Sequence, residues 1–462
     1  MVAGDSSNPQ DYEELGKLQR SESDKQRRKF LRKHRRTLTQ RRKQRARKRG
    51  LIFNPPPGTT KLQNAHGWQF RGKVRYSYRG ADDRYVIRIP RVFSLTKNPE
   101  ETMDIFHTIA FLKQMGAHRI HFDHSKCEYM GLAASVVQDV MVLEMREEWR
   151  QRGVRYSLTG TMPTNREVNQ QFRVMGMTKH LKISGVKTEA EEEAAFTQFE
   201  LFRGKKSLGI KGSDQEKAPS DFTNYIDRCL REGAGYSLNE NGKREIVRWA
   251  GEIITNAEEH SGTHEWYVIG FMKMLDRPGG DEKSQRIGEC HMAIFNFGRS
   301  IAESLKSDQV PEQTRNELKE IADLHRRKFL FRTLDKYSED DLFTLYALQE
   351  GVSSKNAAPG EGDRGNGTVK LITAFQTLGD SKDSSLSPVM TLISGSTRIL
   401  FTKEYQMAPR GDRMIIAFNN ANDLQQRPCA KHVHSLRGRF PGTILSFNFY
   451  IDREHLNVLT QK

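Results

Sequence analysis

The sequence predicts an α/β protein in which strands alternate with amphipathic helices. An apolar-rich segment at residues 85–90 (YVIRIP) precedes a long amphipathic segment from Pro99 to Met115, and a second strand-like segment follows at Arg119–Asp123 (RIHFD). Alternation of these two patterns is typical of a sheet covered by helices. Because 462 residues exceed what one ordinary core needs, we expect two principal domains.

The first predicted domain is a small α/β unit at residues 70–185. After the elements above, the pattern predicts a helix from Leu132 to Arg152, a strand from Val154 to Gly160 and a helix from Asn165 to Met175. Residues 186–220 are rich in Glu, Lys, Gly and Ser. We interpret them as a connector or a peripheral helix.

The second predicted domain covers residues 221–455. It should begin with a long helix and contain several strands, a helical insert and a glycine-rich loop that opens another helix. In chain order these are the helix Gly242–His260, strands Glu265–Met274 and Glu289–Asn296, the insert Ser300–Gln349, the loop Pro359–Gly367, the helix Thr368–Leu378, and strands Val389–Ile393, Met414–Phe418 and Thr443–Ile451.

The positive charge of the chain is concentrated in one short segment. The formal net charge is +17, but 15 of the 75 Lys and Arg residues lie between Lys25 and Arg49, where no residue is acidic, which leaves 60 basic against 58 acidic residues elsewhere. Such a segment buries too little apolar surface to offset its ordering entropy. We therefore expect residues 1–60 to be a basic disordered tail and linker that ends in the helix-breaking run NPPPGTT.

Cysteine spacing and hydropathy exclude two further classes. The four cysteines lie far apart, without the spacing of a metal site. No run of about 18 apolar residues could cross a bilayer, and the first residues are polar and acidic rather than an export signal. We expect a cytoplasmic protein with reduced thiols and no membrane contact.

Three polar residues share one face of the helix predicted at 242–260. Glu252, Asn256 and His260 follow one another at intervals of four, so they project from roughly the same side and can address one ligand. A carboxylate can orient or deprotonate a nucleophile, and an amide oxygen is a hard ligand for Mg²⁺. An ordinary solvated helix face has the same spacing, and taken alone that interpretation is the more common one.

The segment RGNGTVKLITAF, from Arg364 to Phe375, predicts a phosphate cradle. Gly365 and Gly367 permit a backbone bend whose N–H groups point outward, and the start of the following helix favours an anion. A glycine-rich surface turn is the alternative, since the segment lacks the GxxxxGK[ST] pattern.

A polar strand end at AIFNFGRSI, from Ala293 to Ile301, could read a base. Asn296 ends an apolar strand and Gly298 allows a close approach, so the side chain could hydrogen-bond an adenine amino group. A simple strand-to-helix turn is the alternative.

The order of these segments resembles the GHKL ATPase superfamily, which includes DNA gyrase, sensor histidine kinases and MutL. The closest similarity is to the anti-sigma-factor serine kinases, on EIITNAEEHSG (252–262), the segment from Gly351 to Ile372, and PGTILSFNF (441–449), and it spans about residues 220–452. It implies a Bergerat-type α/β sandwich, a mixed sheet with helices on one face, that binds Mg·ATP between the 252–260 helix and the 360–368 loop.

The resemblance also implies roles for individual residues. Glu252 matches the general base, and Asn256 matches the Mg²⁺ ligand. Asn296 stands where the family has the Asp that reads adenine, Gly298 matches the first glycine of that motif, and Ser300 replaces the second. The implied nucleotide-contacting residues are Asn256, His260, Asn296, Gly298, Arg364, Gly365, Asn366, Gly367 and Thr443.

The first domain resembles the STAS domain of anti-anti-sigma factors. The similarity rests on RIHFDHS (119–125), the helix from Leu132, VRYSLTG (154–160) and the stretch from Pro163 to Met177. That family has a phosphorylatable Ser or Thr at the start of the helix after the second strand. Here CEYMGLAAS leaves only Ser125 and Ser135 flanking this position, so we expect no phosphoswitch.

Several activities remain open at this point. The resemblance is compatible with a protein serine or histidine kinase, an ATP-driven clamp that closes as a homodimer, or a scaffold gated by ATP and bound to a protein partner. The alternative is a nucleic-acid-associated protein that uses residues 25–49, with the ATP domain as a conformational switch. A purely solubilising tail is also compatible with the composition.

Deleting residues 1–50 tests the tail. Fifteen positive charges attract phosphates without reading sequence, so the deletion should weaken nucleic-acid binding and flatten its dependence on salt. Fluorescence anisotropy of a labelled oligonucleotide, titrated at several salt concentrations, measures both. Unchanged affinity would contradict a role for the tail in this binding.

Overall fold

A computed structural model describes residues 70–80, 82–174, 202–206, 213–261, 266–275, 286–307, 310–329, 337–352, 367–378 and 386–451. Residues Ala65–Lys462 form one compact unit, separate from Met1–Asn64. The predicted basic tail and linker at 1–60 lie outside the described residues.

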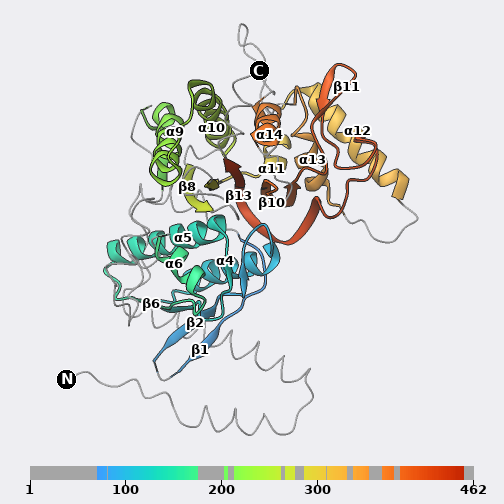
Figure 1. Ribbon diagram of the computed structural model, residues 1–462. Helices are drawn as coiled ribbons and strands as arrows, with labels where there is room; N and C mark the ends of the chain where they lie inside the picture. Colours follow the sequence, from blue (N-terminus) through green and yellow to red (C-terminus); the bar gives the residue numbers. More distant parts are fainter. Residues whose placement is uncertain are drawn as a thin grey trace, which may run out of the picture. The chain divides into compact units, whose positions relative to one another are not determined.

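The first part of this unit is a four-stranded sheet in the order β1-β2-β4-β6 (Figure 1). Strands β2, β4 and β6 are parallel, and β1 pairs with β2 antiparallel. The bounds are β1 Ser77–Arg79, β2 Arg84–Arg88, β4 Arg119–Asp123 and β6 Ser157–Thr161, with helices α4 Pro99–Gln114, α5 Leu132–Gln151 and α6 Arg166–Val174, and a small parallel pair of β3 Val92–Phe93 and β5 Tyr129–Met130.

Local signals define the ends of α4. Pro99 occupies the first turn, where a backbone N–H would have no partner within the helix, so its absence costs nothing. Glu100 and Glu101 lie in the same turn, and their negative charge interacts favourably with the positive end of the helix dipole. The helix ends before Gly116, whose φ of 72° is a left-handed conformation that glycine adopts without strain. Both ends agree with the sequence prediction to within a residue.

The second part is a five-stranded sheet in the order β10-β13-β9-β8-β7. The strands are β7 Phe202–Lys206, β8 Trp266–Leu275, β9 Ile287–Phe297, β10 Val389–Phe401 and β13 Val433–Ile451. All four pairings are antiparallel. The prediction of a mixed sheet is therefore wrong for these strands, because every strand runs opposite to its neighbours.

Helices precede, interrupt and follow these strands. The long helices are α9 Ser213–Ala234, α10 Glu240–Ser261 and α14 Gly367–Leu378; the insert between β9 and β10 holds α11 Ile301–Leu305, α12 Glu312–Phe329 and α13 Glu339–Tyr346; and β11 Ala408–Arg410 pairs with β12 Arg413–Ile415. The predicted helix at 242–260 and the predicted helical insert are both confirmed. None of the helices among the described residues combines the length and apolar character that a bilayer crossing needs.

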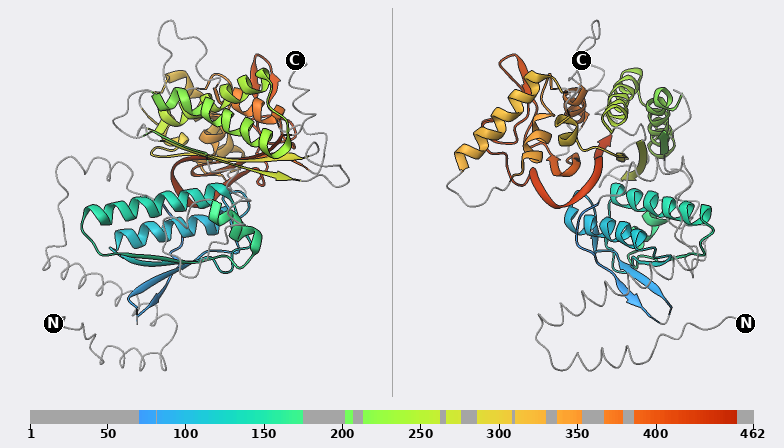
Figure 2. Two further views of the ribbon diagram at one scale, coloured as in Figure 1. Left: turned by 60° about the vertical axis from the view of Figure 1, so that its left-hand side comes forward. Right: turned by 180° about the vertical axis from the view of Figure 1, so that it is seen from behind.

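Both faces of the five-stranded sheet are buried. Strand β9 shows this, because its successive side chains pack alternately into two different apolar clusters. Met292 and Ile294 pack in one apolar cluster with α9, α10 and α14, whereas Phe295 and Phe297 pack in another with α4 and α5. Figure 2 shows α4 and α5 between the two sheets and α9 and α10 on the far side of the second. We call the side of the second sheet that carries α9, α10 and α14 its helix-covered face.

The two predicted α/β halves thus share apolar surface. The ring of Phe70, which also contacts Phe106 of the first part, contacts Phe297 and Phe440 of the second at centroid distances of 6.2 and 5.5 Å. Strand β7 and the start of α9 lie within the predicted connector, so part of it belongs to the second sheet and its helices. The α/β class is confirmed, and the division into domains at 70–185 and 221–455 stays a prediction.

A buried histidine makes the first part sensitive to acid. His124 is fully buried against Phe172 and 3.4 Å from the side-chain nitrogen of Gln138, and this burial lowers its pKa from 6.5 to about 4. The unfolded chain therefore binds a proton more readily than the folded one between these two pH values, so stability is lost as the pH falls from about 6.5 to about 4.

We expect this histidine to contribute about 3 kcal/mol to the loss of stability over that window. The His124→Gln variant should lose less stability than wild type between pH 6.5 and pH 4. Denaturant unfolding at several pH values measures the difference between the two slopes. Parallel slopes for wild type and variant would contradict the assignment, whatever the variant's stability at pH 7.

Candidate functional site

The carboxylate of Glu252 lies against the first residue of α14. Glu252 is half-buried on α10, and a Cβ added at Gly367 would overlap its side chain, including the carboxylate oxygen Oε1. The sequence has 114 residues between these two positions, yet α10 and α14 pack side by side through one apolar cluster. Two of the segments predicted to surround a nucleotide therefore meet in the structure.

The amino end of α14 is electrostatically suited to negative charge. The first backbone N–H groups of a helix have no partners within the helix, and the helix dipole places partial positive charge there. The Glu252 carboxylate is positioned to interact favourably with this end. The absence of a side chain at Gly367 is what permits so close an approach.

Three polar side chains form a row across β9, β13 and β10 on the helix-covered face. Asn296 pairs with Thr443, and Thr443 pairs with Ser394, in the registers of β9, β13 and β10. The backbone N–H of Thr443 donates to Asn296 Oδ1 at 3.2 Å, and the hydroxyls of Ser394 and Thr443 are 2.8 Å apart. Because alternate residues share a face, the row lies on the side that also carries α10 and α14.

The backbone beside this row is packed too closely for a side chain. Gly442 has a φ of 133°, and a Cβ there would overlap the backbone carbonyl of Asn296 and approach the Gly298 nitrogen to 3.0 Å. The Gly298 N–H donates to the carbonyl of Pro441 at 3.0 Å. The predicted strand end at Asn296 and the PGT segment are thus one tightly joined structural unit.

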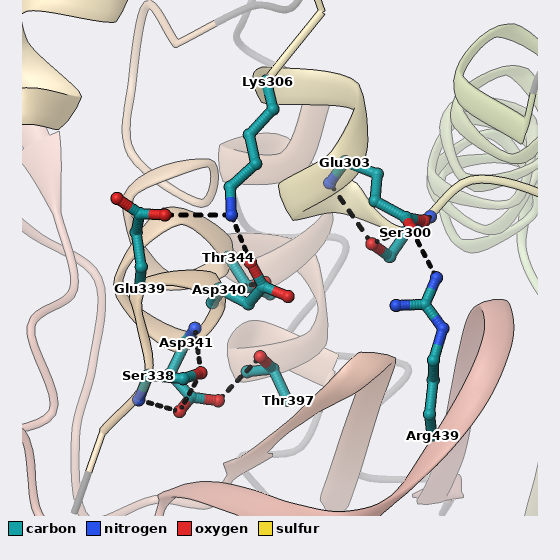
Figure 3. Close-up of polar contacts among 10 residues, drawn as sticks. All are labelled: Ser300, Glu303, Lys306, Ser338, Glu339, Asp340, Asp341, Thr344, Thr397 and Arg439. Atoms are coloured by element: carbon teal, nitrogen blue, oxygen red, sulfur yellow. Dashed lines mark hydrogen bonds and ion pairs between the residues drawn. The ribbon is translucent and has the colours of Figure 1, made fainter. Parts of the chain in front are cut away.

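The chain leaves β9 through a capped helix (Figure 3). Ser300 begins α11 with an extended backbone, and it forms a capping box with Glu303. The N–H of Ile301 donates to Ser394 Oγ at 2.8 Å, which fastens the start of α11 to the polar row. Although burial alone would raise the pKa of Glu303, hydrogen bonds from Ser300 and Arg439 lower it below its usual value.

A second charged cluster in Figure 3 holds α13 against the sheet. Asp341 is fully buried; it accepts bonds from the N–H and hydroxyl of Ser338 at 2.6 and 2.7 Å and from the hydroxyl of Thr397 on β10 at 2.7 Å. Lys306, just after α11, pairs with Glu339 and Asp340 at 3.0 and 2.7 Å. Helices α11 and α13 are thereby fixed to each other and to β10.

The remaining predicted site residues are only partly placed. Asn256 and His260 lie on α10, one and two turns after Glu252, and their side chains are outside the description. Arg364, Gly365 and Asn366 lie outside the described residues. No cluster of three or more His, Cys, Asp or Glu with metal-site geometry occurs among the residues that are described.

Sequence reasoning missed Ser394, the third member of the polar row. A weak signal was present, because a glycine, Gly395, lies two residues after the end of the apolar segment predicted as a strand at Val389–Ile393. Gly395 has a φ of 60° at a shift in strand register, and its missing side chain leaves room for Ser300. A glycine inside a strand often marks such a bulge or a close approach.

Two serines flank the position where the resemblance to STAS domains would place a phosphorylated residue. One is hydrogen-bonded and the other is buried. The Ser125 hydroxyl donates to Asp123 Oδ1 at 2.6 Å, and Ser135 is 1% exposed within α5. Although burial alone would raise the pKa of Asp123, hydrogen bonds from Ser125 and the charges of His121 and Arg88 together lower it below its usual value. The expected absence of a phosphoswitch at this position stays a prediction.

Comparison with known proteins adds no relative. No protein-family model matches the chain, and neither a curated protein nor a solved structure matches it significantly. The functional argument therefore depends on the geometry of this chain.

The contact between Glu252 and Gly367 can be tested by a double-mutant cycle. In wild type, Gly367→Ala should lower the free energy of unfolding, because the new methyl group forces the carboxylate side chain to rotate. In a Glu252→Ala background the same substitution should be neutral or stabilising. We expect a coupling energy of about 1 kcal/mol or more, measured by denaturant unfolding.

Gly251 provides the matched control, since it neighbours Glu252 on α10. A Cβ there would meet only Pro219 Cγ at 3.7 Å, an ordinary contact. Gly251→Ala should therefore stabilise the helix by about 0.5–1 kcal/mol in both backgrounds. Additive effects of Gly367→Ala and Glu252→Ala would show that the two residues do not touch.

Proposed function

We propose that this protein binds Mg·ATP between α10 and the segment that ends at Gly367, as a regulatory protein of the GHKL type. The observation that carries the proposal is the approach of Glu252 to the amino end of α14. It supports a common site for a carboxylate suited to orienting a nucleophile and a helix end suited to a phosphate. The polar row of Asn296, Thr443 and Ser394 supplies hydrogen-bonding groups on the same face of the sheet.

The residue types of the proposed donor set suit magnesium and triphosphate. Asn256 lies one turn beyond Glu252 on α10, so its amide oxygen would hold Mg²⁺ on the face that contains the carboxylate. His260, one turn further, and Thr443 would contact the nucleotide, and the backbone around Gly365 and Gly367 would hold phosphate oxygens. Bound magnesium would neutralise phosphate charge; the protein would supply orientation and a base in Glu252.

Adenine recognition is proposed to differ from that of the family. An adenine amino group is a donor and needs an acceptor, and the Asn296 oxygen already accepts from the Thr443 N–H. A carbonyl oxygen has two lone pairs, so it can accept a second bond, but it does so without the negative charge of an aspartate. We therefore infer weaker discrimination for adenine than an aspartate at this position would give.

The position of the STAS-like part argues against a simple partner switch. Its helices α4 and α5 cover the face of the second sheet opposite the candidate site, through a buried cluster that includes Phe295 and Phe297. A partner that exchanges on and off would not form part of the apolar core. We propose that this part is a structural layer, and that any phosphoryl acceptor or protein partner is another chain or a second copy of this one.

The binding proposal is tested by titrating the full-length protein with ATP, with and without Mg²⁺, by calorimetry. Asn256→Ala should weaken the magnesium-dependent affinity at least tenfold, whereas Glu252→Ala should retain binding and abolish any release of phosphate. Glu245→Ala, an exposed carboxylate on the same helix, removes the same charge and should change neither quantity.

Two results would reject this assignment. Equal affinity of Asn256→Ala and wild type for Mg·ATP would remove the proposed metal ligand. Absence of magnesium-dependent ATP binding by the folded wild-type protein would remove the proposed function altogether.

A further inference from the structure

A cavity of about 590 Å³ opens at the amino ends of the parallel strands of the first sheet. Its lining comes from the turn before β2, the starts of β2 and β4, and the segment that leads into β6, and consists of Asp82, Arg84, His118, Arg119, Arg155, Tyr156 and Ser157. These strands lie side by side in the sheet (Figure 1). The volume is within the range of cavities that hold small organic ligands or a few units of a polymer.

The lining is strongly basic. Three arginines face one carboxylate, and none of the three forms an ion pair with an acidic side chain among the residues that the structure describes. Arg119 donates to the backbone carbonyl of Asp82 at 3.2 Å, a bond that leaves its charge uncompensated. Guanidinium groups bind phosphate through paired N–H donors, and they keep their charge at all physiological pH values.

Repulsion between neighbouring strands strengthens this reasoning. Arg79 on β1 is directly opposite Arg84 on β2, and like charges in this arrangement are destabilising. Burial and the positive charges of Arg84 and Arg79 lower the pKa of His121 on the adjacent strand. The negative charge of Asp123 acts in the opposite direction but does not compensate for them. An anion bound near Arg84 would relieve a repulsion that the folded chain otherwise carries.

An exposed aromatic ring lies in the lining of the same cavity. Tyr156 is 38% exposed, one of three large apolar side chains with such exposure among the described residues. Its ring packs against that of Trp149 on α5, with 5.5 Å between the two ring centroids, and this contact restricts its orientation. Exposed, supported aromatic rings beside arginines are suited to stacking unpaired bases, which gives about 1–3 kcal/mol per base.

We propose that this cavity binds a segment of single-stranded nucleic acid, with phosphates at Arg84, Arg119 and Arg155 and a base on Tyr156. An acidic peptide would use the arginines and leave the tyrosine without a role. A duplex keeps its bases stacked inside and offers none to Tyr156. The site is distinct from the proposed ATP site and from the basic segment at residues 25–49.

The test uses the full-length protein and two probes, a fluorescent single-stranded oligonucleotide of mixed sequence and heparin, a polyanion without bases. Tyr156→Ala should weaken oligonucleotide binding about fivefold or more and leave heparin binding unchanged. The triple variant Arg84→Gln/Arg119→Gln/Arg155→Gln should weaken both. It should also reduce the slope of log affinity against log salt by about 2.

A matched variant controls for loss of charge. Arg231, Arg315 and Lys319 are exposed on α9 and α12, and their replacement by Gln removes the same three charges away from the cavity. Equal weakening by the two triple variants would overturn the proposal, as would equal effects of Tyr156→Ala on oligonucleotide and heparin. The single variant Arg155→Gln, at an exposed position before β6, keeps the test valid if the triple variant unfolds.

Photocrosslinking separates the cavity from the basic tail. An oligonucleotide that carries 4-thiouridine, irradiated on the wild-type protein, should attach to the peptide that contains Tyr156, and Tyr156→Ala should abolish that product. Attachment confined to residues 25–49 would show that the tail alone binds nucleic acid and would reject the cavity as a site.

Discussion

The central sheet is enclosed on both sides, and this constrains what its strands can carry. Apolar residues must occupy both faces, which is why β8 has only one polar residue, Lys273, and β9 is apolar without interruption from Met292 to Phe295. A polar group in such a place costs free energy unless it is hydrogen-bonded. Asn296, Thr443 and Ser394 meet this requirement through one another and through the start of α11.

Two glycines mark where the backbone itself limits the sequence. Gly442 lets β13 approach the carbonyl of Asn296 on the neighbouring strand closely, and Gly367 lets the side chain of Glu252 reach the start of α14. A methyl group at either position would displace a neighbour. Both glycines belong to short segments that the sequence alone had singled out, PGT and GNGT. Their structural reason is close approach between parts of the chain that are more than a hundred residues apart.

Local patterns predicted the helices and strands that have strong periodicity. The predicted helix at 242–260 and the predicted strand at 119–123 were found almost unchanged, because burial of one face leaves a readable period. Strand β7, with the sequence FRGKK, was missed because a short polar edge strand has no such period. Helix α9 was missed partly because Pro219 lies inside it, where proline normally argues against a helix.

The composition of the site was accessible from sequence, but its assembly was not. Spacing on one helix grouped Glu252 with Asn256 and His260, whereas the contact of Glu252 with Gly367 depends on how α10 packs against α14. The antiparallel order β10-β13-β9 likewise places Ser394 beside Thr443 through pairings between distant segments. Only the resemblance to the ATPase superfamily joined these segments in advance, and Ser394 was outside it. The arginine cavity was equally hidden, since its residues come from three strand starts that no local pattern connects.

The departure at Ser300 from the ATPase motif has a physical reason in this fold. A second glycine is needed where the backbone adopts a positive φ or a ligand approaches closely, but Ser300 has φ −74° and ψ 164°, an extended conformation open to any residue. Its hydroxyl instead satisfies an N–H at the first turn of α11, and a cap of this type stabilises a helix by about 1 kcal/mol. Because Glu303 completes the capping box and also pairs with Arg439 of β13, the same residues fix the insert to the strand that carries Thr443. The insert therefore begins as an anchored helix, and any movement of the insert over the proposed nucleotide site would have to begin beyond this anchor.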